Sequence, residues 1–114
     1  MKNLIVVTGG SGFVGSNLIQ FLIKKTKYKI ISLDDYSSGT KKNHIKNRNI
    51  LYLKGDTKDI SKLLGKYKKR IKVLSHFGEF ARIYQSFLQM NKCIQSNTIG
   101  SNAVFDFCLK NKIK

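Results

Sequence analysis

Closely spaced glycines near the N-terminus are the residues of this chain best suited to chemistry with a phosphate. Gly10, Gly12 and Gly15 fit the pattern GxGxxG, and Gly9, Gly12 and Gly15 fit the overlapping pattern TGxxGxxG. Residues without a Cβ let backbone amides come within hydrogen-bonding distance of a phosphate oxygen. The glycine turn is therefore a candidate dinucleotide site, and a turn that only lets a helix pack closely on a sheet is the alternative.

The segments on either side of the glycine turn predict the elements that must position it. An apolar run predicts a strand over 3–8, and helical periodicity predicts a helix over 13–26. The apolar positions expected on one face of this helix are Val14, Leu18, Phe21 and Leu22. A second strand over 29–34 ends at Asp34, 19 residues after Gly15. A carboxylate there can accept both hydroxyls of a ribose and repels a 2′-phosphate, so we expect NAD rather than NADP.

The remainder of the chain continues the alternation of strands and helices. Further strands are predicted over 50–54 and 71–76, a short helix over 58–65, a final helix over 94–111, and a polar, basic surface loop over 36–49. The inner face expected for the final helix comprises Ile99, Ala103, Val104, Phe107 and Cys108. Such an alternation predicts an α/β fold of the Rossmann type, with a parallel sheet of strand order 3-2-1-4 and helices on both faces.

Five motifs in order resemble the N-terminal part of the NAD-dependent epimerase/dehydratase family, the extended short-chain dehydrogenase/reductases typified by UDP-glucose 4-epimerase-like enzymes. They are TGGSGFVGSNL at 8–18, SLDDYSSG at 32–39, GD at 55–56, SHFGEFAR at 75–82 and SNTIGS at 96–101. By this resemblance, residues 1–114 are an NAD(P)-binding Rossmann domain. Family members are about three times longer, so the chain is expected to be truncated before the fifth strand and the catalytic, substrate-binding part.

The resemblance also implies which residues contact the cofactor. In the family, an aspartate matching Asp56 accepts a hydrogen bond from the adenine amino group, and capping of the following helix is the alternative role. Asn97 matches an asparagine near the nicotinamide half, and a helix N-cap is its alternative. The full set of expected cofactor-binding residues is Gly9, Gly12, Phe13, Val14, Gly15, Asp34, Asp35, Tyr36, Ser37, Ser38, Asp56, Thr57, Phe77, Gly78, Glu79, Ala81 and Asn97.

Glu79 departs from the small residues that the family usually has at this position. A carboxylate beside a pyrophosphate is unfavourable unless it points away or pairs with Arg82. Glu79 is interpreted either as a substrate feature of a subfamily or as a solvent-facing side chain. His76, at the end of the preceding strand, is interpreted as a hydrogen-bonded residue rather than a catalyst.

The family's chemistry, as the resemblance implies it, oxidises a hydroxyl of a nucleotide-activated sugar by hydride transfer to NAD and then epimerises or dehydrates the product. Its general base is a tyrosine with a lysine four residues later. None of the 5 tyrosines of this chain has a lysine at that position, so the sequence offers no catalytic residue, and we expect the chain alone to be inactive. The expected partners are a nucleotide-sugar substrate and, for the complete enzyme, a second copy in a homodimer. A non-catalytic NAD-binding module is the alternative.

The net charge of +16 and the isoelectric point near 10.1 raise the question of nucleic-acid binding. Only three of the 22 basic residues are arginine, and the lysines are spread along the chain rather than clustered with aromatic residues. A dedicated nucleic-acid binder more often clusters arginines with stacking aromatics. We therefore expect no specific nucleic-acid partner, although a basic nucleic-acid-binding protein stays as a third alternative.

The remaining sequence features exclude further classes of function. Cys93 and Cys108 have no metal-ligand spacing and are expected to be buried thiols, so no metal site is predicted. No segment approaches the roughly 18 consecutive apolar residues of a membrane-spanning helix, and no secretory signal is present. We therefore expect a cytoplasmic protein without membrane contact.

Overall fold

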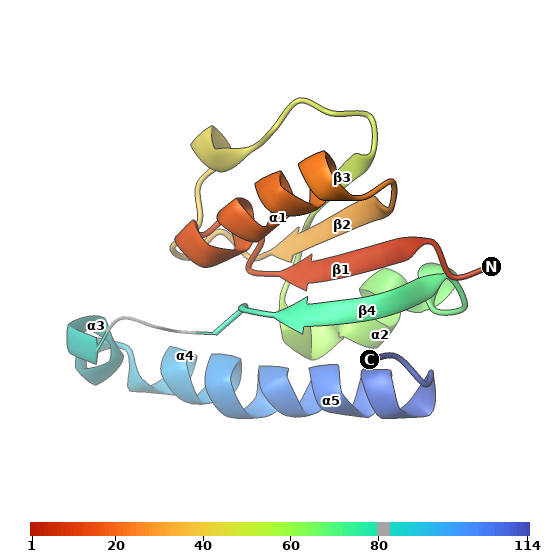
Figure 1. Cartoon of the computed structure of the whole chain (residues 1–114). Coiled ribbons are helices and arrows are strands. Elements are labelled where there is room, and N and C mark those ends of the chain that lie inside the picture. The colour runs from red at the N-terminus through yellow and green to blue at the C-terminus, as the bar shows by residue number, and fades with distance from the viewer. Residues whose placement is uncertain (80–82) are drawn as a thin grey trace.

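Parallel strands form the centre of the computed structural model, which describes residues 1–79 and 83–114. Strands β1 (Leu4–Thr8), β2 (Lys29–Asp34), β3 (Ile50–Lys54) and β4 (Ile71–His76) make a 4-stranded sheet of order β3-β2-β1-β4 (Figure 1). All three strand pairs are parallel, so the carboxyl ends of the strands lie at one edge of the sheet. The predicted fold class, strand positions and strand order are confirmed.

Helices cover both faces of this sheet, as predicted. Helix α1 (Phe13–Lys25) lies on one face, and α2 (Ile60–Leu64) and α5 (Ser101–Lys110) lie on the other (Figure 1). The predicted final helix begins earlier than expected, because α4 (Met90–Ile94) continues through a π-helical segment, Gln95–Gly100, into α5. A further helix, α3 (Ile83–Leu88), was not predicted.

A separate hydrophobic core lies on each face of the sheet. On the α1 side, Ile5, Val7 and Ile30 pack with Ile19 of the helix. On the other side, strand residues including Val6 and Leu33 pack with α2 and α5. Because successive side chains of a strand point to opposite faces, both faces of a central parallel strand must be apolar. This explains the continuous apolar run of β1, all of whose residues are buried.

Two predicted helix faces are partly wrong. Val14 and Phe21 are 55% and 56% exposed, because the inward face of α1 is centred on Gly15 and Ile19. In the final helix, Val104 and Phe107 are buried as predicted, but Ile99 is 50% exposed. A π-helical turn has a different period from the α-helix, and here Gly100 and Ser101 take the inward positions. Cys93 and Cys108 are half-buried rather than fully buried.

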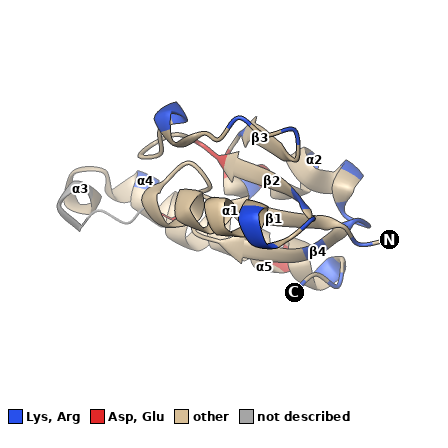
Figure 2. Cartoon of the chain, turned by 45° about the horizontal axis from the view of Figure 1, so that its top comes forward, with Lys and Arg blue, Asp and Glu red and all other residues tan. Residues whose placement is uncertain are grey.

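Charged side chains are unevenly distributed over the fold. Lysine and arginine occur at the end of α1, in the loops beside β3 and towards the C-terminus, and acidic residues lie at the carboxyl end of β2 and on α5 (Figure 2). The basic residues are thus spread over several elements, as they are spread along the sequence. Among the residues that the structure describes, no helix is both long and apolar enough to cross a membrane.

Candidate functional site

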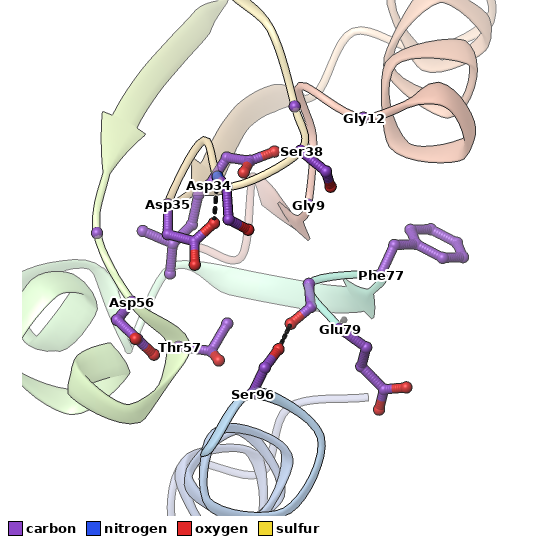
Figure 3. Close-up of a pocket in the computed structure, with 15 residues that line it drawn as sticks. Gly9, Gly12, Asp34, Asp35, Ser38, Asp56, Thr57, Phe77, Glu79 and Ser96 are labelled. Atoms are coloured by element: carbon purple, nitrogen blue, oxygen red, sulfur yellow. Dashed lines mark hydrogen bonds between the residues drawn. The ribbon is translucent and has the colours of Figure 1, made fainter. Parts of the chain in front are cut away.

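A pocket opens at the carboxyl ends of the four strands (Figure 3). In open parallel sheets, ligands bind at this edge, in the crevice where the strand order reverses. Here the order reverses between β1 and β4, and the glycine turn after β1 lies in the same place. The pocket is lined by Gly9, Gly12, Leu33, Asp34, Asp35, Ser37, Ser38, Gly39, Gly55, Asp56, Thr57, Phe77, Gly78, Glu79 and Ser96.

Glycine is required at two positions of the turn for different reasons. Gly9 has φ +69°, and a Cβ there would lie 2.6 Å from the carbonyl oxygen of Phe77. Gly15 packs so closely that a Cβ would collide with the carbonyl oxygen of Gly9. The turn is therefore pressed between the end of β4 and the first turn of α1. A phosphate could approach this backbone closely, because no side chain intervenes.

The N-terminus of α1 suits an anionic ligand. Gly12 is the N-cap and carries no side chain that could bond the first amides, and the first turn of α1 contains no acidic residue. The first amides of an α-helix have no partner within the helix, and the helix dipole places partial positive charge there. A diphosphate at this position would receive hydrogen bonds from backbone amides.

Asp34 is held against the glycine turn. Its Oδ2 accepts a hydrogen bond of 2.9 Å from the amide of Ser11, and its Oδ1 accepts one of 2.8 Å from the amide of Tyr36. Asp34 is only 8% exposed. Because each carboxylate oxygen can accept more than one hydrogen bond, both retain capacity for ligand hydroxyls. Tyr36 adopts φ +62°, which turns the chain sharply after β2.

The loop over 36–49 is attached to the glycine turn through the backbone of Ser11. The carbonyl oxygen of Ser11 accepts hydrogen bonds from the amide of Thr40 at 3.0 Å and from Nδ2 of Asn43 at 2.9 Å. A short 3-10 helix, Lys41–Asn43, places Asn43 for this contact. The loop therefore does more than cover the surface, because it supports the turn that lines the pocket.

His44 adds a second attachment between this loop and the pocket. Its Nε2 lies 2.8 Å from the hydroxyl of Tyr36 and 3.1 Å from the hydroxyl of Ser11. The ring of His44 stacks on Tyr52 of β3, with centroids 3.7 Å apart and planes 12° apart. The Tyr52 hydroxyl in turn accepts from the amide of Ile45 at 2.8 Å. The loop, β3 and the glycine turn are thus joined through one imidazole.

Asp56 and Thr57 bring polar groups to the pocket from the end of β3. Asp56 is the N-cap of a 3-10 turn, Thr57–Asp59, and its Oδ1 accepts from the amide of Lys58 at 3.0 Å. The capping role weighed from the sequence is confirmed, and Asp56 also lines the pocket. Thr57 is 7% exposed and packs against Gly100 of the final helix.

At the end of β4, His76 is hydrogen-bonded through both ring nitrogens, as predicted. Nδ1 lies 2.6 Å from the hydroxyl of Thr8, and Nε2 lies 3.0 Å from the hydroxyl of Ser101. Burial lowers the pKa of His76, and the negative charge of Glu79 opposes this shift only in part. His76 is therefore a neutral imidazole at neutral pH.

The structure places most of the predicted site residues around the pocket. Those that line it are Gly9, Gly12, Asp34, Asp35, Ser37, Ser38, Asp56, Thr57, Phe77, Gly78 and Glu79. Three others line an adjoining hollow that also includes Glu79 and His76: Phe13, Val14 and Gly15. Ala81 and the proposed partner of Glu79, Arg82, lie outside the described residues.

Two predicted residues differ from expectation. Tyr36 does not line the pocket, because its hydroxyl turns towards His44. Asn97 is half-buried inside the π-helical segment, so its alternative role as an N-cap is wrong. Its Nδ2 lies 3.7 Å from Sγ of Cys93, and it is not among the residues lining the pocket.

Residues that sequence reasoning left out also line the pocket: Leu33, Gly39, Gly55 and Ser96. Gly39 could have been found, because it closes the SLDDYSSG motif, and a Cβ there would lie 2.7 Å from Oδ2 of Asp34. Ser96 begins the SNTIGS motif, and its hydroxyl donates to the carbonyl oxygen of Gly78 at 3.4 Å. Among residues 1–79 and 83–114, no group of His, Cys, Asp or Glu could hold a metal ion.

Comparison with known sequences identifies similarity over nearly the whole chain. The profile of the NAD-dependent epimerase/dehydratase family matches residues 5–114. A curated relative, the dTDP-D-glucose 4,6-dehydratase of Dictyostelium discoideum, is 34% identical over 116 residues, which cover 96% of this chain and 27% of that protein. NAD is the cofactor of the matched family, as predicted from Asp34 and the glycine turn.

Solved structures with the same fold include two that are 29% identical to this chain. The UDP-glucose 4-epimerase of Thermotoga maritima, solved with UDP-glucose, matches with a TM-score of 0.86 over 97% of this chain and 35% of its own. An epimerase of Methanothermobacter thermautotrophicus matches with a TM-score of 0.88 over 98% of this chain and 33% of its own. The chain thus spans about a third of the length of these structures.

Proposed function

The chain belongs to the NAD-dependent epimerase/dehydratase family, and we propose that it binds NAD in the pocket at the carboxyl ends of β1 to β4. The observation that carries the proposal is the attachment of Asp34 to Ser11, which joins a candidate ribose-binding carboxylate to the glycine turn. A dinucleotide requires these two groups side by side.

The residues of the pocket fit the parts of NAD. The diphosphate would lie at the glycine turn and the N-terminus of α1, where backbone amides and the helix dipole favour negative charge. Asp34 would accept hydrogen bonds from the hydroxyls of the adenosine ribose. Asp56 would accept from the adenine amino group, because it lines the same pocket from the end of β3.

The charge of the pocket favours NAD over NADP. Asp34, Asp35 and Asp56 all line it, and Figure 3 shows them on one side. A 2′-phosphate added to the adenosine ribose would come close to these carboxylates and be repelled, since no lysine or arginine of residues 1–79 and 83–114 lines the pocket.

We further propose that a nucleotide sugar is the substrate. This rests on the similarity to a dTDP-D-glucose dehydratase and to a UDP-glucose epimerase. When bound, NAD would supply the hydride acceptor for such a reaction. The described residues would bind and orient the cofactor, whereas no tyrosine of the chain has a lysine four residues later to act as the base. A homodimer of the complete enzyme stays a prediction.

A non-catalytic NAD-binding module is the second candidate. Both candidates bind NAD in the same pocket, and they differ only in whether a nucleotide sugar is converted. Incubation of UDP-glucose and NAD with the purified chain therefore tests the module. Formation of UDP-galactose or of a 4-keto-6-deoxy sugar would contradict the module and also the expectation that this chain is inactive alone.

The proposed cofactor site can be tested by NMR titration of the ¹⁵N-labelled chain with NAD. We expect the largest amide shifts in the glycine turn and in 34–39, which include the amides of Ser11 and Tyr36 bonded to Asp34. Residues 109–114, at the C-terminal end of the chain, do not line the pocket and serve as the internal control. Shifts confined to regions outside the pocket would contradict the proposal.

A further inference from the structure

Glu79 is a charged residue of the pocket that the proposed cofactor contacts do not use. Its side chain is 48% exposed, and it lines both the main pocket and the adjoining hollow. Figure 3 shows Phe77 and Glu79 on the side of the pocket away from Asp34, Asp35 and Asp56. A ligand that extends from Asp34 past the glycine turn would therefore reach Glu79.

A chain of hydrogen bonds that leads to Glu79 begins at Thr8. The hydroxyl of Thr8 accepts from the amides of Phe77 and Gly78 at 3.0 and 3.1 Å. Its own proton therefore goes to Nδ1 of His76, 2.6 Å away. A neutral imidazole that accepts at Nδ1 must carry its proton on Nε2.

From His76 onwards each group again donates to the next, until the chain of hydrogen bonds reaches the carboxylate of Glu79. Nε2–H of His76 donates to the hydroxyl of Ser101 at 3.0 Å, and this hydroxyl donates to Oε1 of Glu79 at 2.8 Å. Nε2 itself lies 3.6 Å from Oε1. Every proton in the chain thus has one assigned place, and the last acceptor is the carboxylate. Ser101 is buried, so its hydrogen bond to Oε1 fixes the orientation of Glu79 from the side of α5.

A fixed carboxylate on this side of the pocket suits hydroxyl groups rather than phosphate. Near a diphosphate, an uncompensated carboxylate is repelled. A carboxylate can instead accept two hydrogen bonds from neighbouring hydroxyls, and such charge-assisted bonds are about twice as strong as neutral ones. Oε2 takes no part in the chain of hydrogen bonds from Thr8 to Ser101, so a ligand can bond to it without breaking that chain.

We propose that Glu79 is a diol-binding residue, which accepts hydrogen bonds from vicinal hydroxyls of a ligand beyond the diphosphate. Two sources carry this chemistry, the second ribose of NAD and the sugar of a nucleotide sugar. The inference rests on the proposed NAD site, because the glycine turn sets which part of a ligand reaches Glu79. Ser101 and His76 are positioning residues in this account.

Calorimetric titrations of wild type and Glu79→Gln with NAD, ADP-ribose, ADP, and UDP-glucose in the presence of NAD distinguish the two sources. If the diol is the ribose, Glu79→Gln binds NAD and ADP-ribose roughly tenfold more weakly and binds ADP unchanged. If it is the sugar, only UDP-glucose loses affinity. Unchanged affinity for all four ligands, or tighter binding of NAD by Glu79→Gln, would overturn the proposal.

Two further variants sharpen this test. Asp106→Asn removes an exposed carboxylate on α5 that pairs with Lys110, so it matches the change of net charge and should leave all affinities unchanged. Ser101→Ala removes the donor to Glu79 and should weaken the same ligands as Glu79→Gln, to a smaller extent. A wild-type chain that binds neither NAD nor ADP would instead overturn the proposed function itself.

Discussion

The amide of Ser11 donates a 2.9 Å hydrogen bond to Oδ2 of Asp34, across 23 residues of sequence. This contact joins the turn that would hold a diphosphate to the carboxylate that would hold a ribose. Because Asp34 is 8% exposed, the bond lies where solvent competes little and hydrogen bonds are stronger. The two halves of the candidate cofactor site therefore form one unit, and a change in either is expected to disturb the other.

Gly15→Ala should destabilise the fold, because the added methyl would collide with the carbonyl oxygen of Gly9. Overpacking of this kind costs roughly 1–3 kcal/mol in the free energy of unfolding, which urea denaturation would measure. Gly65→Ala is the matched control, since a Cβ there meets nothing within 4 Å. Equal stability of Gly15→Ala and Gly65→Ala would show that the turn is not packed as described.

His44→Phe should weaken NAD binding while the stack on Tyr52 is kept. The variant removes the ring nitrogen that is hydrogen-bonded to the hydroxyls of Tyr36 and Ser11, which costs about 1 kcal/mol, or roughly fivefold in affinity when the loss falls on the bound state. Tyr52→Phe is the companion variant, because it keeps the stack and loses only the bond from Ile45. If His44→Phe binds NAD as wild type does, the loop does not support the site.

The free energy of unfolding should fall as the pH drops below about 6.5, the usual pKa of histidine. Burial lowers the pKa of His76 in the folded chain, so the unfolded chain binds the proton first and acid favours unfolding. Above this pH neither state is protonated, and the contribution of His76 is fully present.

Urea denaturation between pH 7.5 and 5 tests this expectation in wild type and His76→Asn. The amide oxygen of asparagine can accept from Thr8 as Nδ1 does, but it does not titrate. His44 is present in both proteins, so the difference between them reports His76 alone. A pH dependence equally steep in both would contradict the assigned role of burial.

The strands and their order were predictable because each strand is a short apolar run bounded by polar or glycine residues, as in Leu4–Thr8. The start of the final helix was not predictable from the sequence. Met90 and Ile94 are 50% and 48% exposed, so α4 has no buried stripe that would produce a helical pattern. Exposed apolar side chains also explain the error at Val14 and Phe21, which were predicted to face inwards but lie on the surface of the fold.

The candidate site was predictable where motif and strand end coincide, as for Asp34 and Asp56. The contacts of the loop over 36–49 were not, since its polar and basic composition is that of a surface segment. Its structural role depends on bonds from His44 to Ser11 and Tyr36, and such pairings leave no periodic signal in a sequence. The orientation of Glu79 by Ser101 is another long-range contact of this kind.

The central claim, that Asp34 selects NAD in this pocket, is tested most directly by calorimetric titration of NAD and NADP into wild type and Asp34→Asn. Asp59→Asn, at an acidic residue that does not line the pocket, is the matched control. We expect wild type and Asp59→Asn to bind NAD at least roughly tenfold more tightly than NADP, and Asp34→Asn to lose NAD affinity and most of this preference. Equal affinity of wild type for the two cofactors, or an unchanged preference in Asp34→Asn, would contradict the account.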